Sequence, residues 1–225
     1  FAISTQESRP LLTGLNIRIN GNVMECVTTD SYRLAKKTII LDADYGTYDI
    51  VVPGKNIQEF DKILTDEENV KINLFSNKLL FEYNGYLFQT SLLSGQYPNT
   101  SNLIPTDFEY ILTTNLENFY GAIDRAALLT QNKDKNLINM KTAGNELVIT
   151  SFASEIGKSE ESVAISKNND KDITISYSAK YMLDALKTLN DDELIILMNG
   201  DSKPIILKNA KDDSLIQLIL PIKTY

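Results

Sequence analysis

The sequence predicts an α+β fold in which short antiparallel strands alternate with a few helices, arranged as two similar units. Three observations lead to this prediction. Apolar and polar residues alternate over many short runs, which is the pattern of a half-buried strand. A few longer segments place their apolar residues at helical spacing instead. Turn motifs also recur at a fixed distance along the 225 residues, which indicates an internal repeat.

The repeat is defined by two landmarks. Ile19–Met24 matches Thr142–Leu147, and the glycines of these segments differ by 144 − 21 = 123 positions. Tyr48–Val52 matches Lys171–Ile175 at the same distance, because their aspartates differ by 172 − 49 = 123. We therefore expect two copies of one unit with a constant offset.

Each copy contains a helix after its second landmark. The first helix is expected from Asn56 to Leu64 and the second from Ala179 to Leu189, because apolar residues recur there at helical spacing. Acidic turns at 65–69 and 190–193 close these helices. The alternating strands expected after them are 70–75, 78–83 and 86–92 in the first copy and 194–198, 204–208 and 214–221 in the second.

The second copy also begins with a helix, at about Asn115 to Leu129. Its apolar stripe consists of Leu116, Phe119, Ile123, Ala126 and Ala127. Subtracting 123 places the equivalent helix of the first copy at 115 − 123 = −8 to 129 − 123 = 6. We therefore expect the chain to begin inside a helix and the first copy to be truncated.

The segment 96–105 separates the two copies. It contains two prolines and several small polar residues without periodicity, which is typical of a linker. The sequence therefore predicts two domains, residues 1–103 and residues 104–225.

The composition argues against catalysis and against a bound cofactor. The chain has no histidine, which removes serine–histidine triads, cysteine–histidine pairs and the usual zinc ligands. Segment 199–204 lacks the glycine spacing of a phosphate-binding loop and is expected to be a hairpin turn. No cofactor or metal is expected. The net charge of −8 predicts no general affinity for nucleic acid, so any DNA contact needs basic residues gathered on one face.

The single cysteine and the lack of targeting signals suit a reducing cytosol. Cys26 excludes an internal disulfide, and its alternation with Met24 and Thr28 predicts packing in the core rather than a nucleophile. A membrane-spanning helix needs a run of about 18 apolar residues, and the sequence has none. The first residues carry neither a basic start nor a long apolar run, so no signal peptide is expected.

Five segments carry motifs that occur in order along nearly the whole chain. They are Ser8–Gly14, Thr29–Ala35, Gly95–Pro105, Asp124–Leu129 and Leu218–Tyr225. Together they resemble bacterial DNA sliding clamps, the β subunits of replicative DNA polymerases. The second segment resembles the family motif Thr-Asp-Gly/Ser-His/Tyr-Arg-Leu-Ala, and the third resembles the link between the second and third domains. The resemblance implies that a first domain and the opening of the second are missing here.

The resemblance implies repeated sliding-clamp domains, with antiparallel sheets on the outside of a ring and helices on its inner face. Two three-domain subunits would join head to tail as a homodimer around duplex DNA. Such a ring is a processivity factor without catalytic activity, which slides and raises the local concentration of a tethered polymerase. The implied partners are duplex DNA and, through linear peptide motifs, DNA polymerase, clamp-loader subunits and repair proteins. No membrane partner is implied, and the protein would be cytoplasmic and nucleoid-associated.

In this family a pocket between the second and third domains accepts a short linear peptide. An apolar groove would take the anchor side chains of the peptide, and a few polar groups would fix its direction. Carried over by position, one wall is Leu12, Thr29, Ser31, Tyr32, Arg33 and Leu34, the linker supplies Pro98, Asn102 and Leu103, and the C-terminal copy supplies Pro204, Leu218, Ile219, Leu220, Pro221 and Ile222. At Asn102 the sequence departs from the family pattern, in which a basic residue precedes the apolar residue of the linker. Taken alone, 29–34 is typical of a turn and 218–222 of an edge strand ended by a proline.

The resemblance also implies residues that face DNA or the neighbouring subunit. The candidates for phosphate contact are Arg9, Lys55, Lys62, Arg125, Lys180 and Lys187. The alternative for them is a solvated helix face, which is common for Lys on an acidic protein. Leu128 and Leu129 are implied at the subunit contact, and the alternative for them is ordinary packing at a helix end. If the family interpretation holds, this chain exposes both leucines.

Two other classes of protein stay open. A hydrolase could use paired carboxylates such as Asp42 and Asp44 or Asp191 and Asp192, but these lie in polar, turn-like segments rather than in an apolar cleft. A repeat-built interaction or scaffold module would share the repeated strands without the linker-and-tail pocket. A third copy of the repeat upstream in the gene favours the clamp, whereas a signal peptide there favours the scaffold.

Overall fold

The computed structural model describes residues 1–65, 69–130, 136–154 and 157–223. The chain divides into two compact units, Ala2–Asn99 and Thr100–Tyr225, hereafter the N-terminal unit and the C-terminal unit. The division falls inside the segment expected to be a linker, where the sequence placed the boundary between residues 103 and 104.

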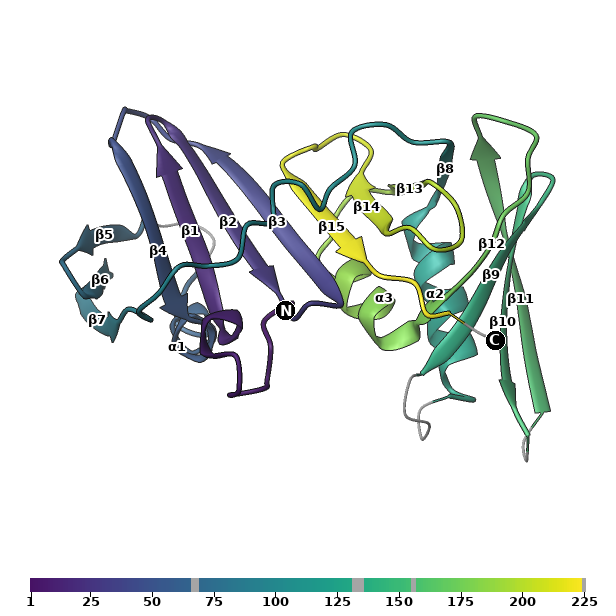
Figure 1. The fold of residues 1–225 in the computed structure, drawn as a ribbon, viewed down its shortest axis with the longest axis horizontal. Coiled ribbons are helices and arrows are strands. Elements are labelled where there is room, and N and C mark those ends of the chain that lie inside the picture. Colours follow the sequence, from purple (N-terminus) through teal and green to yellow (C-terminus); the bar gives the residue numbers. More distant parts are fainter. Residues whose placement is uncertain (66–68, 131–135, 155–156, 224–225) are drawn as a thin grey trace. The chain divides into compact units, whose positions relative to one another are not determined.

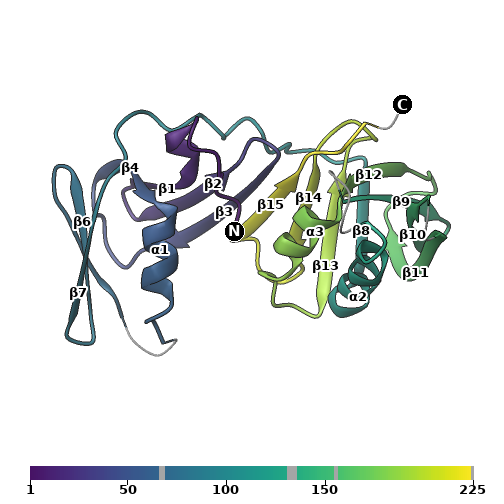
Figure 2. The ribbon, with the colours of Figure 1, turned by 90° about the horizontal axis from the view of Figure 1, so that it is seen from below.

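The described residues of the N-terminal unit form two antiparallel sheets and one α-helix (Figures 1 and 2). Its elements are η1 (Pro10–Thr13), β1 (Gly14–Asn20), β2 (Val23–Thr29), β3 (Arg33–Ile40), β4 (Thr47–Pro53), α1 (Gly54–Asp61), β5 (Lys71–Leu74), β6 (Lys78–Tyr83) and β7 (Tyr86–Ser91). The first sheet has the order β3-β2-β1-β4 and the second β5-β6-β7. Phe60 of α1 stacks on Phe81 of β6 with ring centroids 4.5 Å apart, and Ile17 and Val52 of the first sheet belong to the same core.

The C-terminal unit is a single antiparallel sheet that curves around two helices (Figures 1 and 2). Its elements are β8 (Tyr110–Asn115), α2 (Leu116–Ala127), β9 (Leu137–Ala143), β10 (Glu146–Ala153), β11 (Gly157–Lys167), β12 (Thr174–Ser178), α3 (Ala179–Leu186), β13 (Glu193–Met198), β14 (Ile205–Asn209) and β15 (Leu215–Ile219). The strand order is β12-β9-β10-β11-β8-β13-β14-β15. The α+β fold expected from the sequence is confirmed, and helices are present near 56–64, 115–129 and 179–189, with different bounds.

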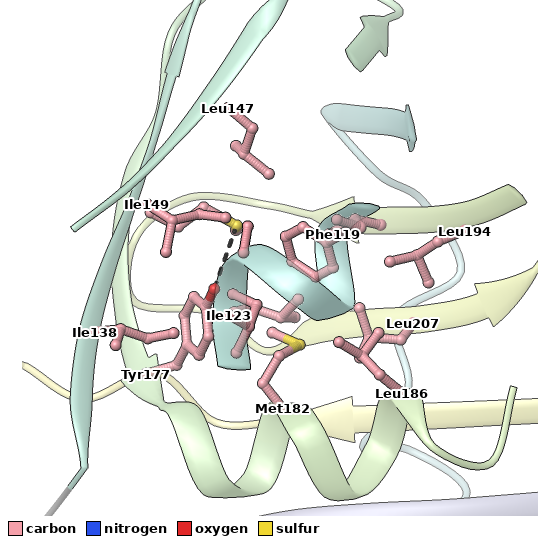
Figure 3. Close-up of a cluster of buried hydrophobic side chains, with 14 of the residues drawn as sticks. Phe119, Ile123, Ile138, Leu147, Ile149, Tyr177, Met182, Leu186, Leu194 and Leu207 are labelled. Atoms are coloured by element: carbon pink, nitrogen blue, oxygen red, sulfur yellow. Dashed lines mark hydrogen bonds between the residues drawn. The ribbon is translucent and has the colours of Figure 1, made fainter. Parts of the chain in front are cut away.

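One apolar core fills the space between this sheet and its helices (Figure 3). Ile138 of β9 and Leu207 of β14 both belong to it, although they lie in distant parts of the strand order. Phe119 of α2, predicted on the apolar stripe, is fully buried there. The hydroxyl of Tyr177 lies 3.7 Å from the sulfur of Met140 inside the same core.

The internal repeat is present, but its offset changes along the chain. The turn glycines Gly21 and Gly144 both adopt a left-handed backbone, with φ of +63° and +60°, at the predicted distance of 123. The helices α1 and α3 instead begin at Gly54 and Ala179, which differ by 179 − 54 = 125 positions. Val23 pairs with Ile40, and Glu146 pairs with Ala164. Glu146 lies 146 − 23 = 123 positions after Val23, but Ala164 lies 164 − 40 = 124 positions after Ile40. One residue is therefore inserted in the hairpin between β10 and β11.

The second landmark of the predicted repeat was therefore wrong by two positions. Asn16 pairs with Val51 across β1 and β4, whereas Asn139, its counterpart in β9, pairs with Ser176 of β12. Since 176 − 51 = 125, the structural counterpart of Asp49 is Thr174 rather than Asp172. A shift of two residues keeps every side chain on the same face of a strand, so the apolar pattern cannot reveal it.

The chain does not begin inside a helix, contrary to the prediction. Residues 1–6 have no helical structure, and the first helical turn is η1. The N–H of Ser4 donates a hydrogen bond of 2.8 Å to the carbonyl of Leu12. An α-helix limited to residues 1–6 would form too few hydrogen bonds to offset the cost of fixing its first turn.

Two other predicted segments fall partly outside the described residues. These are the acidic turn at 65–69, which includes residues 66–68, and the last two residues of the tail, 224–225. No helix in the described part of the chain is long and apolar enough to cross a membrane.

Candidate partner-binding and DNA-facing surfaces

The turn between β2 and β3 is held in shape by its own side chains. The hydroxyl of Thr29 accepts a hydrogen bond from the N–H of Ser31 at 3.1 Å and donates one to the carbonyl of Arg33 at 2.7 Å. Asp30 accepts from the backbone N–H groups of Tyr32 and Arg33 at 2.9 and 3.0 Å, and from Nε of Arg33 at 3.1 Å. Local side-chain bonds of this kind favour a defined turn. The turn therefore presents Tyr32 to solvent, 59% exposed, on a rigid base.

Arg9, the residue before η1, lies beside this turn. Nη1 of Arg9 donates a hydrogen bond of 3.0 Å to the hydroxyl of Ser31. Arg9 immediately precedes η1, whose Leu12 is buried. Arg9 was grouped with the DNA-facing residues, but the structure places it with the turn residues that the sequence assigned to the peptide pocket.

The linker residues expected in the pocket differ in their environment. Pro98 is exposed and belongs to the N-terminal unit, where its carbonyl accepts a hydrogen bond of 3.4 Å from Arg18. Asn102 and Leu103 are exposed and belong to the C-terminal unit. The N–H of Leu103 donates to the carbonyl of Thr100 at 3.1 Å, which closes a turn.

The C-terminal residues assigned to the pocket do not all face the same way. Ile219 is 1% exposed and belongs to the core of the C-terminal unit, so it does not line a surface. Leu218 precedes it in β15 and points to the opposite face, because side chains alternate along a strand. Leu220 is exposed, and the half-buried Ile222 is fixed by a 2.7 Å bond from its N–H to the carbonyl of Ser176. Pro204 and Pro221, each half-buried, lie at the start of β14 and just after β15.

The basic residues expected to face DNA all lie on exposed positions, but several have partners. Lys62, the residue after α1, forms an ion pair with Glu59 in the last turn of that helix, with Nζ and Oε1 2.6 Å apart. Arg125 of α2 pairs with Glu161 of β11 at 2.7 Å. The hydrogen bond from Arg125 lowers the pKa of Glu161 below its usual range. The other three lysines are exposed. Lys55 lies at the start of α1, Lys180 at the start of α3 and Lys187 at the end of α3.

The exposed side of α2 is not uniformly basic. It carries the carboxylates of Glu117 and Asp124 beside Arg125. A groove of about 490 Å³ lies between α2 and β11 and is lined by Glu117, Asn118, Gly121, Arg125, Ser162, Val163 and Ala164. Charge alone therefore does not mark this helix as a phosphate-binding face.

Leu128 and Leu129 follow the end of α2. Leu128 is exposed and Leu129 is half-buried. The nearby strand β11 pairs with β10 over Gly157–Ala164, but with β8 only over Ile165–Lys167. In the described part of the chain, the first half of β11 therefore has an edge without a strand partner, a feature that favours pairing with another chain.

Candidate chemistry rests on the positions of metal-ligand side chains and of the single cysteine. No group of three His, Cys, Asp or Glu side chains is placed to hold a metal ion in the described ranges. Burial raises the pKa of the Cys26 thiol to about 11, and the side chain packs against the core of the N-terminal unit. The thiol is therefore protonated at neutral pH, in agreement with the packing role expected from the sequence.

Sequence reasoning missed two residues that organise the turn. Tyr97 is 3% exposed, and its hydroxyl accepts a hydrogen bond of 3.1 Å from the N–H of Thr29. Asp30 bonds two backbone N–H groups of the turn. The Asx-turn signal of an aspartate two residues before Tyr32 could have identified Asp30. No local pattern could have identified Tyr97, since it lies 97 − 29 = 68 positions away from its partner.

Comparison with known proteins gives a consistent result. A beta sliding clamp of Staphylococcus epidermidis is 43% identical over 227 residues, and one of Staphylococcus aureus is 41% identical over 226 residues. The crystal structure of the DNA polymerase sliding clamp from Bacillus subtilis matches with a TM-score of 0.95 at 38% identity. In all three comparisons the whole of this chain is covered, and it spans 60% of the length of the relative.

Family models match both units of the chain in order. Residues 1–99 match the central domain of the DNA polymerase III beta subunit, and residues 101–223 match its C-terminal domain. Together these matches cover nearly every residue, so the chain belongs to the DNA polymerase III beta subunit family and carries its central and C-terminal domains.

Proposed function

We propose that this chain forms the central and C-terminal domains of a DNA sliding clamp. The complete protein would be a homodimeric ring around duplex DNA that tethers the replicative polymerase, clamp-loader subunits and repair proteins. It would catalyse no reaction, because tethering acts only by raising the local concentration of a partner at the primer end. It would work in the cytoplasm, at the nucleoid, without a membrane partner. The observation that carries the proposal is the match of two consecutive family domains over nearly the entire chain.

We further propose that the turn at 30–33, η1 and the tail residues after β15 bind the linear peptides of these partners. The exposed ring of Tyr32 and the exposed side chain of Leu220 supply apolar contact area, and Arg9 supplies a directional polar group. Arg33 is buried and bonded to Asp30, so its role is to hold the turn. Aromatic and arginine side chains commonly dominate the binding energy of such interfaces. Ile219 acts from the core by holding β15 in place.

The open edge of β11 and the exposed Leu128 support the proposed contact between subunits. An edge strand offers a row of backbone N–H and C=O groups, and an apolar residue beside it adds buried area. Both features lie in the C-terminal unit, as a head-to-tail contact requires of one of its two surfaces. The proposed DNA contacts use the exposed Lys55, Lys180 and Lys187, which can each neutralise a phosphate.

The peptide site can be tested by fluorescence polarisation. A labelled peptide that ends in a Gln-x-Leu-x-Leu/Phe motif is titrated with this chain, and affinity on the order of micromolar is expected. Tyr32→Ala is expected to weaken binding by about tenfold, since an exposed aromatic anchor is lost. The matched control is Tyr86→Ala in the same unit, because Tyr86 is similarly exposed, at 65%, and lies on β7.

Two outcomes contradict the proposed site. Absence of binding by the folded chain contradicts the peptide-binding function itself. Equal losses for Tyr32→Ala and Tyr86→Ala place the peptide elsewhere. Removal of residues 220–225, which lie after β15, provides a second test that does not touch the turn.

A further inference from the structure

The connecting segment at the end of the N-terminal unit is bound firmly to the first sheet. The N–H of Leu93 donates a hydrogen bond of 2.8 Å to the carbonyl of Val51, at the β4 side of the sheet. A Cβ atom at Gly14 would lie 2.9 Å from the side chain of Leu93, so the glycine allows this close approach. Further along the segment, Nη2 of Arg18 donates a hydrogen bond of 3.4 Å to the carbonyl of Pro98. Figure 1 shows the segment, in teal, crossing the strands of the sheet toward β2.

Tyr97 connects this segment to the end of β2. The ladder between β1 and β2 ends at the pair Asn16–Val27, so the N–H of Thr29 lies beyond it. The hydroxyl of Tyr97 takes the place of a strand carbonyl and accepts the hydrogen bond from this N–H at 3.1 Å. A buried backbone N–H without an acceptor is unfavourable, so the hydroxyl fixes the backbone of Thr29.

The position of Thr29 controls the turn that follows. Its side-chain hydroxyl bridges the N–H of Ser31 and the carbonyl of Arg33. Ser31 has φ of +79°, a left-handed conformation that a non-glycine residue adopts only when its surroundings hold it there. A displacement of Thr29 would remove the bonds that maintain this conformation.

We propose that Tyr97 is a positioning residue for the peptide-binding turn, and that its hydroxyl couples the connecting segment to the shape of the turn at 30–33. The inference rests on the proposed peptide-binding function. Tyr97 does not touch the peptide in this account. It acts through Thr29, whose hydroxyl holds the turn that presents Tyr32.

The hydroxyl remains a neutral partner throughout the physiological pH range. Burial raises the pKa of Tyr97 to about 12. The ring is buried and is retained in a phenylalanine variant, so Tyr97→Phe removes only the hydrogen bond. This makes the hydroxyl separable from the packing of the ring.

The same unit contains a closely matched control. Tyr83 is also buried, at 4% exposure, and its hydroxyl accepts a hydrogen bond of 2.8 Å from the backbone N–H of Thr65. Tyr83 lies on β6, in the other sheet, and takes no part in the turn. Tyr97→Phe and Tyr83→Phe therefore each remove a bond between a tyrosine hydroxyl and a backbone N–H, one linked to the turn and the other not. Tyr83→Phe also removes a 2.6 Å bond to the hydroxyl of Thr65, which makes it the more severe change for stability.

The experiment compares the two variants in the full chain by peptide affinity, urea unfolding and amide NMR. Both are expected to lower the urea midpoint, Tyr83→Phe at least as much as Tyr97→Phe because it removes two bonds to Thr65. Only Tyr97→Phe is expected to weaken binding of the labelled Gln-x-Leu-x-Leu/Phe peptide, by roughly fivefold, which corresponds to about 1 kcal/mol. Only this variant is expected to shift the amide resonances of Thr29, Ser31 and Arg33 and to speed their hydrogen exchange.

The outcomes separate this inference from the proposed function. If the unmodified chain binds no peptide, the proposed function fails and the inference falls with it. If the unmodified chain binds and Tyr97→Phe binds equally well, the function stands and the positioning role is overturned. Equal loss of affinity in both tyrosine variants also overturns it, because the effect then follows general stability.

Discussion

Nη1 of Arg9 donates a hydrogen bond of 3.0 Å to the hydroxyl of Ser31, across 31 − 9 = 22 positions of sequence. This contact joins the residue before η1 to the turn between β2 and β3. A guanidinium held beside an exposed tyrosine can direct a peptide by hydrogen bonds to its backbone or to a carboxylate. The contact therefore favours a role for Arg9 in partner binding over the DNA contact implied by the family resemblance.

Arg9→Ala is expected to weaken binding of the labelled clamp-binding peptide by about threefold, within the range of a lost hydrogen bond. Its affinity for duplex DNA at low salt should stay unchanged. Lys180→Ala should weaken binding to duplex DNA and leave peptide affinity unchanged, because Lys180 is exposed on α3 and can contact a phosphate. Fluorescence polarisation with the two labelled ligands checks both. A loss of DNA affinity without a loss of peptide affinity in Arg9→Ala would return the residue to the DNA-facing group.

Ser31→Gly should be neutral or stabilising by up to about 1 kcal/mol, because glycine adopts a positive φ without steric cost. The gain competes with loss of the hydroxyl that accepts from Arg9. Ser31→Val should destabilise the unit by about 1–3 kcal/mol, since a β-branched side chain is strained at φ of +79°. Urea unfolding of both variants tests the prediction. Equal stability of the glycine and valine variants would show that the turn relaxes to another backbone conformation.

The N-caps of α2 and α3 should differ in their contribution to stability. Asn115 accepts from the N–H of Asn118 at 2.9 Å and also donates to the carbonyl of Asp192 at 3.2 Å. Ser178 accepts from the N–H of Tyr181 at the longer distance of 3.5 Å. Asn115→Ala should cost about 1–2 kcal/mol and Ser178→Ala less than about 1 kcal/mol. Thermal and urea unfolding would contradict this if the serine variant proved the less stable of the two.

Stability should be nearly constant around neutral pH and fall in alkali. The chain has no histidine to titrate between pH 6 and 8. Burial raises the pKa of Cys26 from 9.0 to about 11 and that of Tyr97 from 10.0 to about 12, so the folded state keeps protons that the unfolded state releases. The free energy of unfolding therefore decreases as the pH rises above about 9 and continues to decrease toward 12.

Urea midpoints measured from pH 6 to 11 by circular dichroism check this prediction. Cys26→Ala removes the group that titrates first, so its alkaline decrease should begin about one pH unit later, near the pKa of an unfolded tyrosine. The decrease in the unmodified chain would have another cause if Cys26→Ala lost stability over the same pH range.

A row of apolar side chains at one end of the first sheet is partly exposed to solvent. Ile39, Met24, Ile19 and Tyr48 are neighbours across β3, β2, β1 and β4, and the first and last of them are exposed. The equivalent row in the C-terminal unit is fully buried, and three of its four residues lie in β9, β10 and β11, which contact α2. It consists of Val163, Leu147, Thr142 and Ile173.

Ile39→Lys should therefore lower the fluorescence of a dye that binds exposed apolar surface, without loss of the fold. Thr38→Lys is the matched control, because Thr38 is the preceding residue of the same strand and points to the opposite face. Equal dye binding by the unmodified chain and Ile39→Lys would show that the row is already covered in solution.

Much of the secondary structure could be predicted from periodicity. Strand β6 has the predicted bounds, and the apolar stripe of α2 marks the buried face of that helix. Helix ends were less predictable. α1 and α3 stop at Asp61 and Leu186, before the last apolar residues of their patterns, because residues beyond a helix can still pack against its core. α2 stops at Ala127, the last residue of its stripe and two residues before its expected end. The two-residue change of offset within the second copy was invisible for a related reason, since a shift of two leaves the alternation of faces unchanged.

The sequence by itself determined the fold class, the order of elements, the repeated unit and the lack of histidine chemistry, because these depend on local periodicity and composition. Only the tertiary structure decided which polar and apolar groups meet. It brought the hydroxyl of Tyr97 to the N–H of Thr29 and the guanidinium of Arg9 to the hydroxyl of Ser31. It also placed Ile219 in the core of the C-terminal unit. Such contacts join residues far apart in the sequence. They depend on how strands and loops close over one another, which no short pattern along the chain records.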